Sequence, residues 1–268
     1  DKSLLAFHPD YAIVLNIGTD HYDKAELAAM FARFLNQARR GAVVEAEVFR
    51  MVRDMVRPDL PLAIFDGDAA PRNAGSCAYW LSGYESAGGV ARAAWNGSAL
   101  FALPVPGRHT ALNMLAVMAF LELAGWSSDA ARQAALRTQG VARRFDCRGH
   151  HRSGAPVIDD YAHNPEKVAC CIRAAQELAP GRVWTIFQPH GYKPLGFMRG
   201  ELGTLLQKTL RAEDRFFLME PYYAGGTSSF RPHAAEVAAE WRQTGLIQTE
   251  AGESRPQVAA ILDRECAS

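Results

Sequence analysis

Strand-like and helix-like segments alternate along the second half of the chain, and this alternation restricts the fold more than any other feature. The apolar runs lie at 157–159, 183–188 and 215–219, and the helical patterns lie at 166–178, 202–211, 234–243 and 258–266. Strands separated by helices favour a parallel sheet with right-handed crossovers. We therefore predict a compact α/β domain of the Rossmann type in this half.

The first half alternates less regularly. A buried strand is predicted at 11–17, a helix with one apolar stripe at 25–39, and a further helix and short strand at 48–56 and 62–65. Weak alternation at 71–97 indicates short antiparallel strands. Two more helices are expected, one at 110–124 with Thr110 as its N-cap and one from the cap Ser127 to about Gly140. Basic and small residues at 148–154 indicate a domain junction or a hairpin.

Composition narrows the range of partners. The 268 residues are enough for two domains, and 29 basic residues balance 29 acidic ones. No overall field favours nucleic acid or an anionic membrane, and no apolar run approaches the length of a membrane span. The five cysteines show no C-x-x-C spacing, which is typical of a reduced, cytoplasmic protein. We expect partners to be small molecules selected by local chemistry, and the sequence does not indicate an oligomeric state.

The segment from Val157 to Pro165 carries the most concentrated polar chemistry. Val157 and Ile158 end a predicted buried strand, and two carboxylates, a tyrosine and a histidine follow before Asn164 caps a helix that begins at Pro165. Ligands of open α/β sheets bind at this edge. The alternative is that Asp160 and Asn164 serve only the turn and the cap.

Two further motifs support a ligand site. Residues 106–113 read P-G-R-H-T-A-L-N and open an apolar helix, with His109 and Asn113 four residues apart on one face. Residues 13–23 form a strand that ends in polar and acidic residues around His21.

Together with Arg143-Arg144-Phe145 and the F-Q-P-H-G-Y run at 187–192, these motifs follow the order found in the Mur ligase superfamily, which the chain resembles over nearly its whole length. Members join an amino acid to a carboxylate using ATP, and the alanine-adding branch is the most similar. The resemblance implies a partial central Mur-ligase ATPase domain at 1–142, followed by a Rossmann-like C-terminal α/β ligase domain at 143–268. No G-x-x-x-x-G-K-S/T loop occurs, so we expect a fragment that lacks the N-terminal domain and P-loop and is inactive by itself.

The resemblance also assigns roles to residues. It implies that His21 binds a Mg²⁺ ion, although Mg²⁺ prefers oxygen ligands. The alternative is that His21 only caps or packs at the strand end. It implies that His109 and Asn113 contact the adenine of ATP, the alternative being that both only lie on the helix surface. It also implies that Arg144 and Asp160 contact the nucleotide. The predicted catalytic residues are His21, His163 and His190. The predicted substrate-binding residues are Tyr161, His163, His190, Tyr192, Lys193 and Arg199.

The amino-acid pocket departs from the alanine-adding pattern. Gly191 and Pro194 stand where that branch carries arginines suited to a carboxylate. Either Lys193 or Arg199 supplies the missing charge, or the incoming amine is not free L-alanine. Asn36 stands where other branches carry a carbamoylated lysine, which favours the alanine-adding branch or the tripeptide-recycling ligases.

We therefore predict an ATP- and Mg²⁺-dependent ligase that joins an amino acid to UDP-N-acetylmuramate, or a related acid, through an acyl phosphate in peptidoglycan precursor synthesis. One alternative is a noncatalytic relative that uses the same surfaces for binding. Another is an amide ligase of a different pathway, such as tripeptide recycling, folylpolyglutamate synthesis or cyanophycin synthesis.

Overall fold

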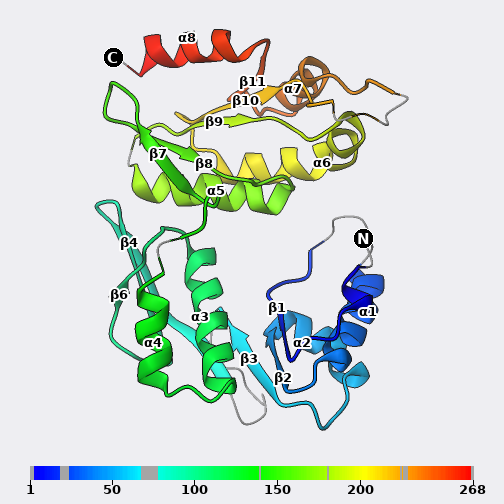
Figure 1. Cartoon of the computed structure of the whole chain (residues 1–268). Coiled ribbons are helices and arrows are strands. Elements are labelled where there is room, and N and C mark those ends of the chain that lie inside the picture. The colour runs from blue at the N-terminus through cyan, green and yellow to red at the C-terminus, as the bar shows by residue number, and fades with distance from the viewer. Residues whose placement is uncertain are drawn as a thin grey trace. The chain divides into compact units, whose positions relative to one another are not determined.

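The computed structural model describes residues 3–18, 24–67, 78–138, 140–179, 181–223, 225 and 229–266. It divides into two compact units, Asp1–Gln139 and Gly140–Ser268 (Figure 1). Each unit combines a sheet with helices, so the predicted α/β class is confirmed. No helix in the described ranges is long and apolar enough to cross a membrane.

The first unit is built on a six-stranded sheet in the order β1-β2-β3-β4-β5-β6. The strands are β1 (Tyr11–Val14), β2 (Gly41–Glu45), β3 (Leu62–Asp66), β4 (Ala78–Ala87), β5 (Val90–Trp95) and β6 (Phe101–Ala102). The helices are η1 (Ser3–Ala6), α1 (Lys24–Gln37), α2 (Ala46–Val52), η2 (Arg53–Met55), α3 (Arg108–Leu123) and α4 (Ser128–Leu136). Strands β1 to β4 pair in parallel. Strands β4 and β5 pair antiparallel, as predicted for 71–97, of which 71–77 lie outside the described residues, and β6 pairs antiparallel with β5.

Both faces of this sheet are covered by helices. On β2, Val43 belongs to the core that includes Leu115 of α3, whereas Val44 belongs to the core that includes Leu35 of α1. Neighbouring strand residues point to opposite faces, so a continuous apolar run fills two cores at once. Figure 1 shows α3 and α4 on one side of β1 to β3, with α1 and α2 on the other.

The second unit has a parallel sheet in the order β11-β10-β9 and a separate antiparallel hairpin of β7 and β8. The strands are β7 (Asp146–His150), β8 (Pro156–Asp159), β9 (Trp184–Phe187), β10 (Arg215–Met219) and β11 (Thr249–Gly252). The helices are α5 (Pro165–Leu178), α6 (Tyr192–Thr209), α7 (Ala234–Gln243) and α8 (Arg255–Glu265).

Strand β10 is the centre of this unit. Phe216 and Leu218 pack with the residues of α5, α6 and α7, whereas Phe217 and Met219 pack with Val258 of α8. Figure 1 shows α5 and α6 on one face of the sheet and α8 on the other. The predicted parallel α/β arrangement of this half is confirmed.

Several local predictions are also confirmed. Asn164 caps α5, since its Oδ1 accepts a hydrogen bond from the Lys167 N–H at 3.0 Å, and Pro165 is the first helical residue. Ser127 caps α4 in the same way. The basic segment at 148–154 connects β7 and β8 as a hairpin.

Other predictions were wrong. Thr110 is not a cap: α3 begins after Gly107, whose φ of 105° needs glycine, and the Thr110 hydroxyl donates to the Pro106 carbonyl at 3.1 Å. Strand β8 is not buried, because it pairs only with β7 and leaves Val157 49% exposed.

Some elements were missed or placed too short. Strands β2, β6 and β11 were not predicted, and α6 begins at Tyr192 rather than at residue 202. In β11 the residues Thr-Glu-Ala-Gly give no apolar signal, although Thr249 is fully buried. In α6, three glycines and Pro194 hide the helical pattern. Gly203 is nevertheless required, because a Cβ there would lie 2.7 Å from Nε1 of Trp241.

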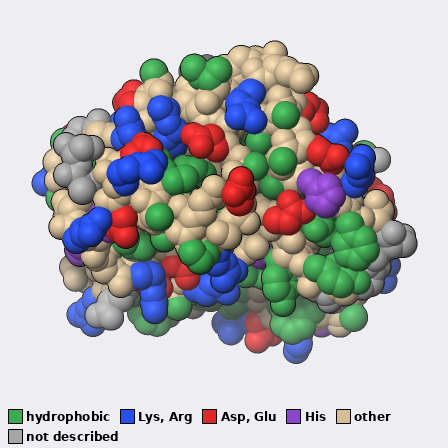
Figure 2. Space-filling view, turned by 90° about the horizontal axis from the view of Figure 1, so that it is seen from above, with side chains coloured by type: hydrophobic (Ala, Val, Ile, Leu, Met, Phe, Trp, Pro, Cys, Tyr) green, Lys and Arg blue, Asp and Glu red, His purple; other side chains and the backbone are tan. Residues whose placement is uncertain are grey.

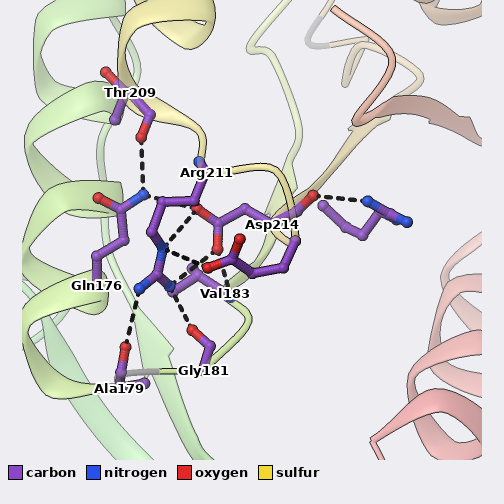
Figure 3. Close-up of polar contacts among 9 residues, drawn as sticks. Gln176, Ala179, Gly181, Val183, Thr209, Arg211 and Asp214 are labelled. Carbon is purple, nitrogen blue, oxygen red and sulfur yellow. Dashed lines mark hydrogen bonds and ion pairs between the residues drawn. The ribbon is translucent and has the colours of Figure 1, made fainter.

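At the amino end of the sheet, Asp214 ties four chain segments together (Figure 3). Its side chain is fully buried and accepts hydrogen bonds from Gln176 Nε2 at 2.7 Å, Val183 N at 2.9 Å and Arg211 N at 2.9 Å. The Arg211 guanidinium also pairs with it at 3.0 Å. Burial by itself raises the pKa of Asp214, but these hydrogen bonds outweigh it and hold the pKa below its usual value.

We expect Asp214→Ala to lower the free energy of unfolding of the second unit by about 3–5 kcal/mol, because the backbone N–H groups of Val183 and Arg211 and the Gln176 amide lose their acceptor and the partly buried Arg211 guanidinium loses its shortest ion pair. Urea titration followed by hydrogen exchange in β10 measures this. Glu213→Ala is the matched control: Glu213 meets Arg211 at 3.5 Å but is 45% exposed, so its loss should cost less than about 1 kcal/mol.

The effect should also depend on pH. A depressed pKa stabilises the fold fully above the unfolded value of about 4 and loses that contribution as pH falls through the folded value. The difference between wild type and Asp214→Ala should therefore shrink in acid. Equal stability of the two proteins at pH 7 would contradict this role.

Candidate active site

The second unit contains a cavity of about 320 Å³ at the carboxyl end of its strands. Its lining comes from β9, from Arg143 and from the segments that follow β8, β9, β10 and β11. The carboxyl edge of a parallel sheet is where α/β folds bind ligands. Among its residues are Arg143 before β7, Asp160 and Tyr161 after β8, Gln188 and His190 after β9, Tyr222 after β10, and Arg255 after β11.

Asp160 organises one wall of the cavity. One carboxylate oxygen accepts the Phe145 N–H at 2.7 Å and the other accepts the Ala162 N–H at 2.7 Å. The Tyr161 N–H donates to the Arg143 carbonyl at 2.9 Å beside them. Arg143 and Phe145 have φ of 59° and 51°, a conformation that costs energy for residues other than glycine. Asp160 thus holds a strained turn against the loop after β8, and its predicted contact with a nucleotide stays a prediction.

The ring of Tyr161 gathers cationic and imidazole groups around it. The guanidinium carbons of Arg143 and Arg144 lie 4.8 and 5.7 Å from its centroid, within the range of a cation–π contact. The rings of His163 and His190 lie 5.5 and 5.4 Å from it. Four predicted site residues are therefore together, and the positive charge among them suits an anionic ligand.

A chain of hydrogen bonds defines another part of the cavity. Gln188 Nε2 donates to the Glu220 carbonyl at 3.0 Å, and Arg255 Nη2 donates to Gln188 Oε1 at 2.8 Å. The Glu220 carbonyl thereby orients the Gln188 amide, and the amide oxygen positions the Arg255 guanidinium.

Among the cavity residues with polar side chains, four were not predicted as site residues from sequence: Arg143, Gln188, Tyr222 and Arg255. Arg143 and Gln188 lie within motifs that had been recognised, and Tyr222 follows the predicted strand at 215–219 in a segment to which no role had been assigned. Arg255 carried no signal, because it follows β11, the strand whose small and polar residues hid it.

The three predicted substrate residues of α6 lie outside the lining of the cavity. Tyr192 is buried against Phe230 and His233, and burial raises its pKa, to which the nearby Glu220 carboxylate adds. Lys193 is exposed in the first turn. Arg199 Nε pairs with Glu240 Oε2 of α7 at 3.2 Å. Their roles in substrate binding stay predictions.

In the first unit, the described part of the predicted nucleotide site lies on α3. His109 is partly buried, and Asn113 is exposed one turn later. His21, the predicted metal ligand, lies outside the described residues. Within the ranges that are described, no group of three or more His, Cys, Asp and Glu side chains is arranged to hold a metal ion.

Comparison with known proteins agrees with this architecture. Residues 143–267 match the family described as "Mur ligase, glutamate ligase domain". The matched residues cover nearly all of the unit that contains the cavity, and over them the chain resembles the Mur ligase superfamily.

Within that superfamily, relatives that add alanine are among the most similar. The UDP-N-acetylmuramate–L-alanine ligase of Coxiella burnetii (strain Dugway 5J108-111) is 29% identical over 238 residues, covering 84% of this chain and 50% of the relative. The chain spans about half the length of the curated relatives it matches. The structure of the UDP-N-acetylmuramate–alanine ligase of Thermotoga maritima aligns with a TM-score of 0.70 at 22% identity, covering 97% of this chain and 55% of that one.

The fold is shared more widely than the alanine-adding activity. Folylpolyglutamate synthase of Mycobacterium tuberculosis, solved with ADP, aligns with a TM-score of 0.64 at 17% identity, covering 98% of this chain and 59% of that one. Because its identity is so low, this likeness concerns the fold alone.

We expect Asp160→Asn to loosen the wall of the cavity, because an amide offers one acceptor oxygen where the carboxylate uses two. Loss of a hydrogen bond to a charged group costs about 1.5–3 kcal/mol, so exchange of the Phe145 or Ala162 amide should become about tenfold faster or more. The neighbour Asp159→Asn is the control, since Asp159 makes only an exposed ion pair with Arg143 at 3.4 Å. Unchanged protection of both amides in Asp160→Asn would remove its organising role.

Proposed function

We propose that this chain is part of an amide ligase that uses ATP to join an amino acid to UDP-N-acetylmuramate or a related carboxylic acid. The observation that carries the proposal is the cluster of Arg143, Arg144, His163 and His190 around Tyr161 at the carboxyl edge of the second unit. The match of residues 143–267 to the Mur ligase family and the names of the relatives support the same reaction.

Amide formation needs an activated acid and an unprotonated amine. ATP, when bound, supplies the phosphoryl group that activates the carboxylate, and Mg²⁺ neutralises phosphate charge. The chain's own task is then to position oxyanions and to remove a proton from the attacking nitrogen. Arg143 and Arg144 suit the first task because guanidinium groups bind planar and tetrahedral oxyanions through several N–H donors.

His163 is placed for the second task. Its Nδ1 lies 2.9 Å from the Tyr161 carbonyl oxygen, which can only accept, so Nδ1 carries the hydrogen. In the neutral ring Nε2 then keeps its lone pair and is able to accept a proton from the amine. This assignment gives His163 the role of general base and leaves His190 to orient the substrate.

For the nucleotide, Asn113 supplies the recognition groups on the first unit. It is exposed, has no hydrogen-bond partner among the described residues, and offers both a donor and an acceptor, as the edge of adenine requires. Val117, one turn further along α3, is 43% exposed and adds an apolar contact beside it.

We expect Asn113→Ala to raise the KM for ATP by about tenfold or more, because one or two hydrogen bonds to the base are lost. Steady-state kinetics on the complete gene product measures this. Gln133→Ala removes the same kind of amide from the exposed surface of α4 and should leave the KM unchanged. If Asn113→Ala folds normally and its KM for ATP is unaltered, Asn113 does not bind the nucleotide and is only a residue of the helix surface.

The complete gene product should form an amide when supplied with ATP, Mg²⁺, UDP-N-acetylmuramate and a suitable amino acid, with one phosphate released per amide. Phosphate assay and mass spectrometry over a panel of amino acids, including L-alanine, test this. The same panel with a folate and glutamate tests the alternative pathway. The 268-residue chain, which contains no G-x-x-x-x-G-K-S/T loop, should release no phosphate by itself. Absence of any amide from the complete gene product would favour the noncatalytic alternative.

A further inference from the structure

We propose that Arg255 binds the carboxylate of the incoming amino acid and so determines which amines are accepted. This inference rests on the proposed ligase function. It gives a role to a residue that neither the motifs nor the sequence pattern singled out.

Arg255 is held at the right edge of the sheet. It is the first residue of α8, in the turn that follows β11, and it lines the same cavity as Asp160, Tyr161 and His190. Its Nη2 donates to Gln188 Oε1 at 2.8 Å, and the Gln188 amide is itself fixed by the Glu220 carbonyl at 3.0 Å. A guanidinium held in this way loses little freedom when it binds a ligand.

The charge of Arg255 is also uncompensated. Among the ion pairs of the described residues, none involves Arg255, whereas Arg143 pairs with Asp159 and Arg199 pairs with Glu240. The carboxylate that lines the cavity, Asp160, already accepts two backbone N–H groups. A guanidinium has five N–H donors, of which the contact with Gln188 uses one, so a bidentate contact with a carboxylate is open to it.

Other sources of positive charge fit this task less well. Lys193 and Arg199 do not line the cavity, and Gly191 and Pro194 at the start of α6 have no side-chain donor. Arg143 and Arg144 lie over one ring and present two charges together, which suits a phosphate. Arg255 is a single cation beside a neutral amide, which suits the single charge of a carboxylate.

The test uses the complete gene product with Arg255→Ala and Arg255→Lys. In Arg255→Ala the KM for the amino acid should rise about tenfold or more, as expected for loss of a charge-assisted bidentate contact, while the KM for ATP stays within about twofold. Arg255→Lys keeps the charge but not the two-pronged guanidinium geometry, so its KM for the amino acid should lie between those of wild type and Arg255→Ala. Melting temperatures establish that both variants fold, and Arg255→Lys carries the test if Arg255→Ala does not.

The amino-acid carboxamide provides a readout that a structural role would not change. Wild type should prefer the amino acid to its carboxamide, which lacks the negative charge, and Arg255→Ala should lose most of that preference. Arg264→Ala is the matched control, since Arg264 lies on the same helix, is 73% exposed and is not in the cavity lining. Lys193→Ala and Arg199→Ala test the alternative that one of these two residues binds the carboxylate instead.

Three results would overturn the inference while wild type still forms an amide. The first is an unchanged amino-acid KM and carboxamide preference in Arg255→Ala. The second is a rise in the KM for ATP instead, which would mean that the bound oxyanion is a phosphate. The third is loss of the preference in Lys193→Ala or Arg199→Ala. If wild type forms no amide with any substrate, the proposed function itself fails and this inference falls with it.

Discussion

Burial of β10 on both faces is the constraint on which the second unit depends. Phe216 and Leu218 need helices on one side, and Phe217 and Met219 need a helix on the other. A strand that is apolar on both faces pairs in parallel and must be connected by crossovers, which return each strand in the same direction. The segments that follow β9, β10 and β11 therefore all emerge at one edge, and the cavity forms there because side chains from different crossovers meet. On the face shown in Figure 2, basic and acidic side chains are interspersed, and charges of one sign are not gathered there.

The two ends of this sheet use carboxylates for different purposes. Asp214 is fully buried at the amino end, and its carboxylate bonds to Gln176, Val183 and Arg211, so these hydrogen bonds serve the stability of the fold. Asp160 accepts two backbone N–H groups in the same manner, but at the carboxyl end it leaves the adjoining arginines, histidines and tyrosine exposed to a ligand. A carboxylate acceptor thus fixes the backbone in each case, and its position at the amino or the carboxyl end of the sheet decides whether that order serves folding or binding.

Residues with strong local preferences were predictable from sequence. The helix start at Asn164-Pro165 and the strand at 215–219 could be predicted without tertiary information. The motifs also singled out Arg144, Tyr161, His163 and His190, which lie together in the structure. The pattern failed where burial is not accompanied by hydrophobicity. Strand β11 packs closely against Met219 at Gly252, where a Cβ would collide with the Met219 sulfur. Such a requirement for a small residue leaves no periodic signal in the sequence. Arg255 was missed for that reason, and the contacts of Arg199 with Glu240 likewise depend on a helix distant in sequence.

The bridge made by Asp160 has a mechanical consequence. It joins Phe145, in the segment through which the chain enters the second unit, to Ala162, in the loop that carries Tyr161 and His163. A ligand that restrains this loop therefore also restrains the entering segment, and thermal motion of the entering segment is passed to Tyr161 through two short hydrogen bonds. The Asp160 carboxylate is therefore the point through which the loop and the entering segment restrain each other.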